Sequence, residues 1–167
     1  MEDACYIFES MSERDVVSWN AMIGGYAVQG FADDALRLIR SMLRAGMIPD
    51  SFTLGSIMKA LVGGSTSLDL GRQIHALVLK CQSKHDVAIG NTLIDMYSKS
   101  GEIEDVKQVF NEMEQKNVIS WTSLIAGYGK NGYRHKAIAM YKKMESEGLK
   151  PNDVTFLTLL FACSHVG

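Results

Sequence analysis

Few residues in this chain have the type and spacing that catalysis or metal binding requires. The three cysteines, Cys5, Cys81 and Cys163, are far apart and have neither Cys-x-x-Cys spacing nor histidine partners at metal-ligand spacing. We therefore expect them to be small core residues in a reducing compartment. The fragment SIMK, from Ser56 to Lys59, matches a Ser-x-x-Lys nucleophile motif, but the companion motifs of a hydrolase site are absent. No phosphate-binding glycine-rich loop is present either, so no cofactor and no metal are expected.

Several aromatic side chains could provide stacking platforms for bases. They lie at helical spacing and comprise Trp19, Tyr26, Tyr97, Trp121 and Tyr128. Residues of this type more often pack between helices, with their polar tips hydrogen-bonded. We expect packing here too.

A long sequence motif occurs twice. The stretch DVVSWNAMIGGYAVQG begins at Asp15, and NVISWTSLIAGYGKNG begins at Asn117, an offset of 102 residues. The same offset relates Gly46 to Gly148 and continues through the following proline and threonine. The chain is therefore an array in which a large segment recurs.

The composition limits the class of protein. The chain has 167 residues, a net charge of −2, 47% hydrophobic residues and only two prolines. No apolar run reaches the roughly 20 residues that a membrane-spanning helix needs. The net charge argues against a nonspecific basic nucleic-acid binder, so phosphate contacts would have to come from local lysines and arginines.

Apolar residues at helical spacing predict a series of short amphipathic helices separated by glycine and proline turns. Cutting the chain before each first helix of a pair gives repeats at 16–50, 51–86, 87–117 and 118–152, with 35, 36, 31 and 35 residues. Residues 1–15 are expected to be a lone second helix, and residues 153–167 a lone first helix, of a longer array. Such hairpins must stack to bury their apolar faces, which predicts an all-α solenoid.

The alternation of lengths, with SWNAMIGGYAVQG, TLGSIMKAL and NTLIDMYSKSGEIEDVKQVF, resembles the plant pentatricopeptide-repeat family over the whole chain. It is most similar to the subclass with alternating standard, long and short repeats. The resemblance implies a right-handed α-solenoid of antiparallel helical hairpins. It also implies sequence-specific binding of single-stranded RNA in mitochondria or chloroplasts, one base per repeat, often to direct cytidine-to-uridine editing.

In that family, the fifth and last residues of a repeat select the base, and the second residue packs against it. By position, the resemblance implies the reader pairs Asn20/Asp50, Gly55/Asp86, Asn91/Asn117 and Thr122/Asn152, and the base-packing residues Val17, Phe52, Ala88 and Ile119. We expect Val17, Phe52 and Ile119 to be at least partly exposed on one concave face. The four last residues each precede a first helix, where Asp and Asn are also good helix caps, so capping is an alternative role.

The chemistry of the last residue indicates which base is preferred. An ionised Asp can only accept, which suits the N3–H of uracil, whereas Asn can donate to the ring nitrogens of cytosine and adenine. The resemblance implies uracil for Asn20/Asp50, a pyrimidine with cytosine preferred for Asn91/Asn117 and adenine for Thr122/Asn152, and hence a core 5′-U-N-C-A-3′. Gly55 has no side chain, so the long repeat is expected to be indifferent.

Lys99 and Lys130 occupy equivalent places near the ends of first helices, where family members often bind the RNA backbone. Val28 and Gly63 occupy this place in the other two repeats. A solvated role is the alternative for each lysine.

The chain lacks the His-x-Glu and Pro-Cys-x-x-Cys signature of a zinc deaminase, so we expect an RNA-binding chain that is not itself an enzyme. The expected partners are single-stranded RNA and proteins of an editing complex, with no membrane. Exposed apolar residues at the two ends, Phe8, Met11, Leu159 and Leu160, also predict end-to-end self-association. The alternative function is a protein-binding scaffold of the tetratricopeptide type, which shares the helical hairpins but has repeats of 34 residues.

Overall fold

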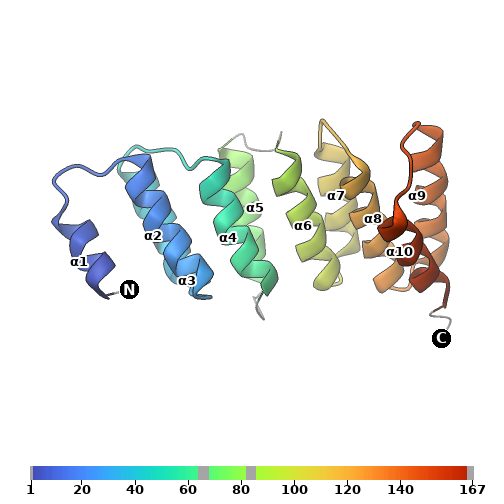
Figure 1. The fold of residues 1–167 in the computed structure, drawn as a ribbon, viewed down its shortest axis with the longest axis horizontal. Helices are drawn as coiled ribbons and strands as arrows, with labels where there is room; N and C mark the ends of the chain where they lie inside the picture. The colour runs from blue at the N-terminus through green and yellow to red at the C-terminus, as the bar shows by residue number, and fades with distance from the viewer. Residues whose placement is uncertain (1, 64–67, 82–85, 165–167) are drawn as a thin grey trace. The chain divides into compact units, whose positions relative to one another are not determined.

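The computed structural model describes residues 2–63, 68–81 and 86–164, and these residues form an all-helical protein (Figure 1). Within these ranges there are ten helices and no strand. The helices are α1 (Glu2–Ser10), α2 (Val16–Val28), α3 (Ala32–Arg44), α4 (Ser51–Gly63), α5 (Leu68–Lys80), α6 (Val87–Lys99), α7 (Ile103–Glu112), α8 (Val118–Lys130), α9 (Arg134–Ser146) and α10 (Asp153–Ser164). The prediction of an all-α chain is confirmed.

The helices begin and end where the local sequence dictates. Asp15, Asp86 and Asn117 cap the first turns of α2, α6 and α8 by accepting hydrogen bonds from backbone N–H groups. After α2, a left-handed glycine, Gly30, reverses the chain with φ of 81°, and Gly132 does the same after α8 with φ of 80°. These short turns return the chain as an antiparallel helical hairpin.

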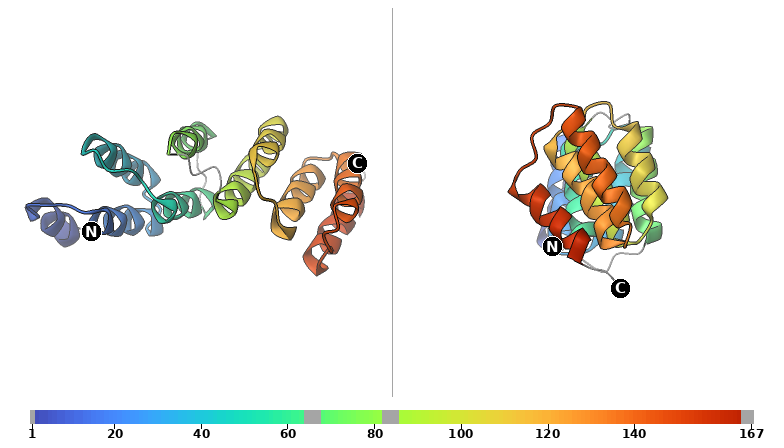
Figure 2. Two further views of the ribbon diagram at one scale, coloured as in Figure 1. Left: turned by 90° about the horizontal axis from the view of Figure 1, so that it is seen from above. Right: turned by 90° about the vertical axis from the view of Figure 1, so that its right-hand side faces the viewer.

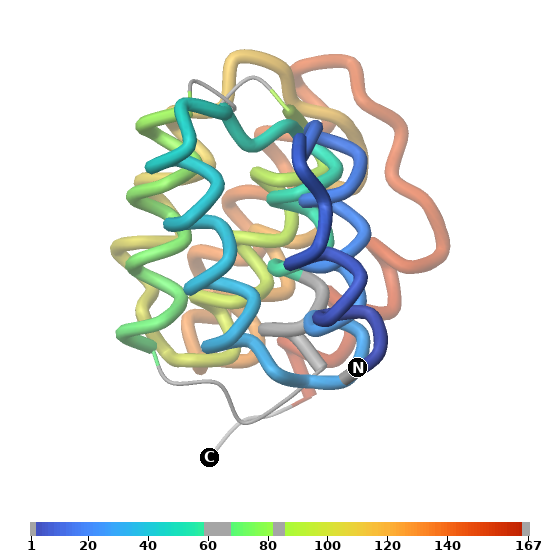
Figure 3. Tube along the Cα trace, turned by 90° about the vertical axis from the view of Figure 1, so that its left-hand side faces the viewer, coloured from blue at the N-terminus to red at the C-terminus, as the bar shows by residue number. Residues whose placement is uncertain are grey.

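The chain divides into two compact units, Met1–Ser83 and Lys84–Gly167. In the N-terminal unit, α2 packs against α3 and α4, α4 packs against α3 and α5, and α1 packs against α2. Figure 3 traces α2 and α3 as neighbouring arms of one hairpin. The first helices α2 and α4 thus lie side by side.

In the C-terminal unit, the hairpins are α6 with α7 and α8 with α9, followed by α10 (Figure 2). The first helix α8 packs between α6 and α10, and it also contacts α7 and α9. Consecutive first helices are therefore direct neighbours, which places the starts of successive repeats next to one another.

The core of each unit contains an edge-to-face aromatic pair. The rings of Phe8 and Trp19 are 4.8 Å apart at 77°, and those of Phe110 and Trp121 are 4.8 Å apart at 75°. Both tryptophans are buried, as predicted. The prediction that their indole N–H groups are hydrogen-bonded is wrong, because neither Nε1 has a partner within the described residues. The edge-to-face contact fixes each ring instead. Phe8 was predicted to be exposed but is buried by the same contact.

Three tyrosines are also predicted to pack between helices, and they are buried to different degrees. Tyr97 and Tyr128 are also buried, whereas Tyr26 is only partly buried.

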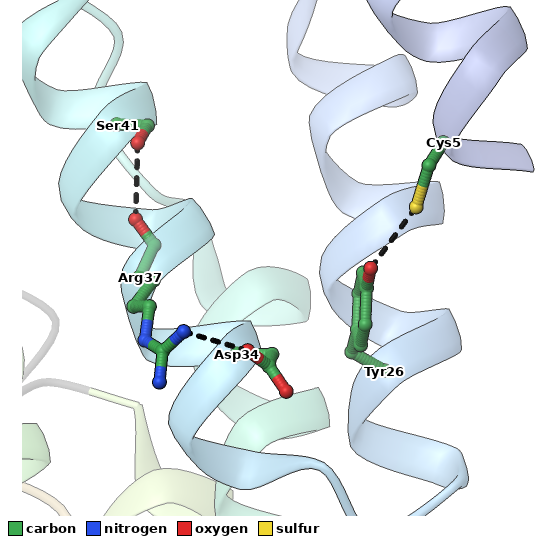
Figure 4. Close-up of polar contacts among 5 residues, drawn as sticks. All are labelled: Cys5, Tyr26, Asp34, Arg37 and Ser41. Atoms are coloured by element: carbon green, nitrogen blue, oxygen red, sulfur yellow. Dashed lines mark hydrogen bonds and ion pairs between the residues drawn. The ribbon is translucent and has the colours of Figure 1, made fainter. Parts of the chain in front are cut away.

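The cysteines are less buried than predicted. All three are free thiols and only partly buried. Cys5 Sγ lies 3.0 Å from the hydroxyl of Tyr26, and this hydrogen bond raises the pKa of Tyr26 (Figure 4). A hydroxyl partner at the edge of the core explains why Cys5 is not enclosed by apolar side chains.

Beside this contact, Arg37 pairs with Asp34 at 3.2 Å on the surface of α3 (Figure 4).

None of the helices in the described ranges has the length and apolarity needed to cross a bilayer. Nor do the described residues place three His, Cys, Asp or Glu side chains together as a metal site would require.

Candidate nucleic-acid interface

All four predicted last residues accept hydrogen bonds at the N-terminus of the following first helix. The Oδ1 atoms of Asp50, Asn117 and Asn152 accept from the backbone N–H three residues later, at 2.8, 3.0 and 2.9 Å. Asp86 Oδ1 instead accepts from Ala88 N–H at 2.8 Å and more weakly from Ile89 N–H at 3.3 Å. Capping uses one oxygen of each side chain, so each retains a second polar atom that can meet a ligand.

The first reader pair is assembled by direct contact. Asn20, on α2, donates from Nδ2 to both carboxylate oxygens of Asp50, at 3.2 and 3.1 Å. The hydroxyl of Thr53, on α4, donates to Asn20 Oδ1 and lies 2.8 Å from Asp50 Oδ1. Two neighbouring first helices thus bring the fifth and last residues together.

These contacts also keep Asp50 ionised. Burial alone would raise the pKa of Asp50, but hydrogen bonds from the backbone and hydroxyl of Thr53 and from the amide of Asn20 outweigh it and lower the pKa below its ordinary value of 3.8. At neutral pH, Asp50 therefore carries only acceptor atoms.

A third residue links the pair Thr122 and Asn152. The Thr122 hydroxyl lies 2.8 Å from the Thr155 hydroxyl, which in turn lies 2.9 Å from Asn152 Oδ1. Asn152 N–H also donates to the Thr155 hydroxyl, at 3.3 Å. Thr155 has no solvent exposure, so this connection is protected from water.

The pair Asn91 and Asn117 has no such connection. Asn117 forms a reciprocal capping box with Ser120, with Asn117 N–H donating to Ser120 Oγ at 3.3 Å. Within the described part of the chain, the Oδ1 atom of Asn91 is buried and has no hydrogen-bond partner. Asn91 is therefore an acceptor that the protein leaves unused.

The fourth pair falls in different units, Gly55 in the N-terminal unit and Asp86 in the C-terminal unit. Gly55 has open space around its Cβ position. Gly55 therefore provides no polar side chain to this predicted pair.

The predicted base-packing residues are exposed, as expected. Val17 is 73% exposed, Phe52 66% and Ile119 58%, and Ala88 is also exposed. Each immediately follows the first residue of a first helix and is therefore close in sequence to a capping Asp or Asn. Large apolar side chains at this exposure are available to cover a flat ring.

The two predicted phosphate-binding lysines differ in their surroundings. Lys99 pairs with Asp95 at 2.9 Å, which neutralises part of its charge. Lys130 is exposed and lines a groove of about 430 Å³ together with Thr122 and Val154. The groove therefore places the Thr122 hydroxyl, which is 8% exposed, near an ammonium group and an exposed apolar side chain, and the carboxylate of Asp95 also lines it.

Sequence reasoning missed the hydroxyl residues that follow the last residues: Thr53, Ser120 and Thr155. All three are completely buried although they are polar. A signal was present, because each lies three residues after a capping Asp or Asn, which is the spacing of a capping box. In the repeat that begins at Val87, an isoleucine, Ile89, takes this place.

The chain was compared with protein families and known proteins. A model described as the PPR repeat family matches residues 14–63 and 116–165, and a PPR repeat model matches residues 91–118. A pentatricopeptide repeat-containing protein of Arabidopsis thaliana is 47% identical over all of this chain and 30% of its own length. Another from Arabidopsis thaliana, named as mitochondrial, is 42% identical over 99% of this chain and 26% of its own length. The chain thus spans less than a third of these relatives.

Solved structures show the same fold. The pentatricopeptide repeat protein PPR10 in complex with an 18-nt psaJ RNA element superposes with a TM-score of 0.76 at 20% identity, covering 96% of this chain and 25% of PPR10. PPR10 from maize gives a TM-score of 0.55 at 21% identity, over 96% of this chain and 28% of that one. The fold is therefore that of an all-α helical-repeat solenoid. The family models, which match more than half of the chain, establish that the chain belongs to the pentatricopeptide repeat family.

Proposed function

We propose that this chain is a sequence-specific module for single-stranded RNA that reads one base per repeat. The observation that carries the proposal is the contact between Asn20 and Asp50, which joins a fifth and a last residue at one accessible site. A structural scaffold has no need to pair these two side chains. The presence of RNA in the PPR10 complex supports RNA as the ligand.

The proposed recognition sequence is 5′-U-N-C-A-3′. Asp50 presents acceptors to the N3–H of uracil, and Asn152 has an amide that can donate to N1 of adenine. Asn91 and Asn117 are assigned cytosine, and the repeat with Gly55 is assigned no preference. In each repeat, the exposed second residue replaces part of the stacking that a base loses when it leaves its neighbours.

The wider role is also a proposal. Repeat lengths of 35, 36, 31 and 35 residues support the subclass with alternating standard, long and short repeats, with divisions after Asp50, Asp86, Asn117 and Asn152. We assign the chain to an RNA-processing factor, with cytidine-to-uridine editing as the process. The mitochondrial names of two relatives support an organelle, the mitochondrion or the chloroplast.

Fluorescence anisotropy with labelled oligonucleotides tests the proposal. The chain is titrated with an RNA strand that contains UNCA, with the DNA of the same sequence and with the corresponding RNA duplex, at low salt because phosphate contacts weaken as salt rises. The RNA strand should bind most tightly, and replacing its A by G should weaken binding about fivefold. Equal binding of all three nucleic acids, or no binding, would favour the protein-binding scaffold instead.

A further inference from the structure

The buried hydroxyls of Thr53 and Thr155 each touch both members of a reader pair. Thr53 contacts Asn20 and Asp50, and Thr155 contacts Thr122 and Asn152. In the pair Asn91 and Asn117, Ser120 donates its backbone N–H and its hydroxyl to Asn117 Oδ1. Neither threonine is exposed, so neither can touch a base itself.

A single hydroxyl proton determines how Thr122 is oriented. Thr155 has one proton to donate, and Asn152 Oδ1 at 2.9 Å is an acceptor that cannot donate. The contact of 2.8 Å between the two threonine hydroxyls then requires Thr122 to donate to Thr155. Thr122 is left with lone pairs only and is therefore an acceptor toward a ligand.

The same network fixes the orientation of the Asn152 amide. Its Oδ1 accepts from both the N–H and the hydroxyl of Thr155, at 2.9 Å each. An amide with its oxygen engaged must present its Nδ2 as a donor. Thr122 and Asn152 together show a base one acceptor and one donor.

Thr53 produces the opposite pattern at Asn20 and Asp50. Its hydroxyl lies between two acceptors, Asn20 Oδ1 and Asp50 Oδ1, and Asn20 Nδ2 donates to the Asp50 carboxylate, so the amide keeps its Nδ2 as the donor of the pair. Asp50 remains an acceptor because its carboxylate has no proton to give. In this pair, the fifth residue, Asn20, presents the donor and the last residue, Asp50, presents the acceptor. In the pair Thr122 and Asn152, the fifth residue accepts and the last residue donates.

We infer that Thr53 and Thr155 are positioning residues that set the donor and acceptor pattern of the reader pairs. The inference depends on the proposed RNA-binding function. Adenine and cytosine each carry an amino donor beside a ring acceptor, and they match the pattern at Thr122 and Asn152. Uracil and guanine carry a carbonyl acceptor beside a ring N–H, and they match the pattern at Asn20 and Asp50.

Two other repeats provide an internal comparison. Ile89 lies three residues after Asp86, where the other repeats have Thr or Ser. The predicted partner of Asp86 is Gly55, which has no side chain that a hydroxyl could orient. Ser120 uses its hydroxyl on Asn117 Oδ1 at 3.2 Å, while Asn91 Oδ1 has no partner within the described residues. Within the described residues, no hydrogen bond to Oδ1 orients the amide of Asn91, so its base should be selected less strictly.

The test is base selection by valine and serine variants of Thr155. Val has nearly the same shape as Thr but no hydroxyl, whereas Ser keeps the hydroxyl. Affinities of the 167-residue chain are measured by anisotropy for four RNA strands that differ only at the base assigned to Thr122 and Asn152. Thr155→Val should reduce the preference for A and C over G and U about fivefold, the value of one hydrogen bond, and Thr155→Ser should retain it.

Thr53→Val repeats the test in the N-terminal unit, in case Thr155→Val fails to fold. It should reduce the preference for U and G at the base assigned to Asn20 and Asp50 only. Ile89→Val is the matched control and should leave selection unchanged at every base. Thermal unfolding of each variant identifies losses that come from instability.

The outcomes separate the two proposals. If the wild-type chain selects bases and the valine variants select them equally well, the hydroxyls are only caps and the inference is wrong, while the proposed function stands. If the wild-type chain shows no base preference at all, the proposed function fails and the inference fails with it.

Discussion

Asn20 Nδ2 donates to both carboxylate oxygens of Asp50, at 3.2 and 3.1 Å, although the two residues are 30 positions apart in the chain. The contact exists because α2 and α4 pack side by side. It stabilises the carboxylate form of Asp50 and leaves Asp50 exposed and Asn20 partly exposed.

Asp50 should make the free energy of unfolding depend on pH in the acidic range. Its pKa is lower in the folded chain than the ordinary value of 3.8, so its contribution to the free energy of unfolding is fully present above pH 3.8 and is lost as the pH falls through the folded pKa. Wild-type protein should therefore lose more stability between pH 7 and pH 3 than Asp50→Asn does. Urea denaturation over this pH range measures the difference, and parallel losses in the two proteins would contradict it.

Two phenylalanines should separate stability from binding. Phe110 is 5% exposed and packs edge-to-face on Trp121, so Phe110→Ala should lower the free energy of unfolding by about 3 kcal/mol. Phe52 is 66% exposed, so Phe52→Ala should change it by less than about 0.5 kcal/mol. Only Phe52→Ala should weaken RNA binding in a protein that remains fully folded. Equal stability losses in the two variants would show that Phe52 belongs to the core.

Lys130 should contribute to the salt dependence of RNA binding. Removing one phosphate contact to a single strand lowers the slope of log affinity against log salt by about 0.7. Lys130→Gln should show this change, and Lys142→Gln, an exposed lysine on α9, should not. Anisotropy titrations at several salt concentrations measure the slopes. An unchanged slope for Lys130→Gln would leave this lysine as a solvated surface residue.

Exposed apolar side chains at the two ends of the chain should cause self-association. On α1, Tyr6 is 76% exposed and Ile7 is 62% exposed, and on α10, Leu160 is 66% exposed. Leu160→Glu should lower the mean mass at high concentration in sedimentation velocity. Val28→Glu is the control, because Val28 is exposed and lies on α2, which is not a terminal helix. A wild-type chain that is monomeric at all concentrations would rule out this association.

The helices could be predicted from the sequence because local signals agree with one another. Apolar spacing, capping Asp and Asn residues and left-handed glycines such as Gly30 and Gly132 all act within a few residues of the chain. The exposure of Val17, Phe52 and Ile119 could also be predicted, because the base-packing role that the family resemblance implies for them requires exposed side chains.

Contacts between helices were harder to predict. The burial of Phe8 depends on its packing against Trp19, and the role of Thr155 depends on Thr122, 33 residues away. The spacing from a capping Asn could identify Thr155 as a capping partner, but it could not show that Thr155 also contacts Thr122. Their hydrogen bonds become evident only when neighbouring first helices are placed side by side.

Selection from a randomised pool of single-stranded RNA by wild-type protein and Asp50→Asn tests the central claim most directly. Asp and Asn are equivalent as helix caps to within a few tenths of a kcal/mol, so stability should barely change. The enriched base at the position assigned to Asn20 and Asp50 should shift from uracil toward cytosine, by about 1 kcal/mol for one exchanged hydrogen bond, with the other positions unchanged. Enrichment of uracil by both proteins to the same degree would contradict base reading by Asp50 and leave it as a helix cap alone.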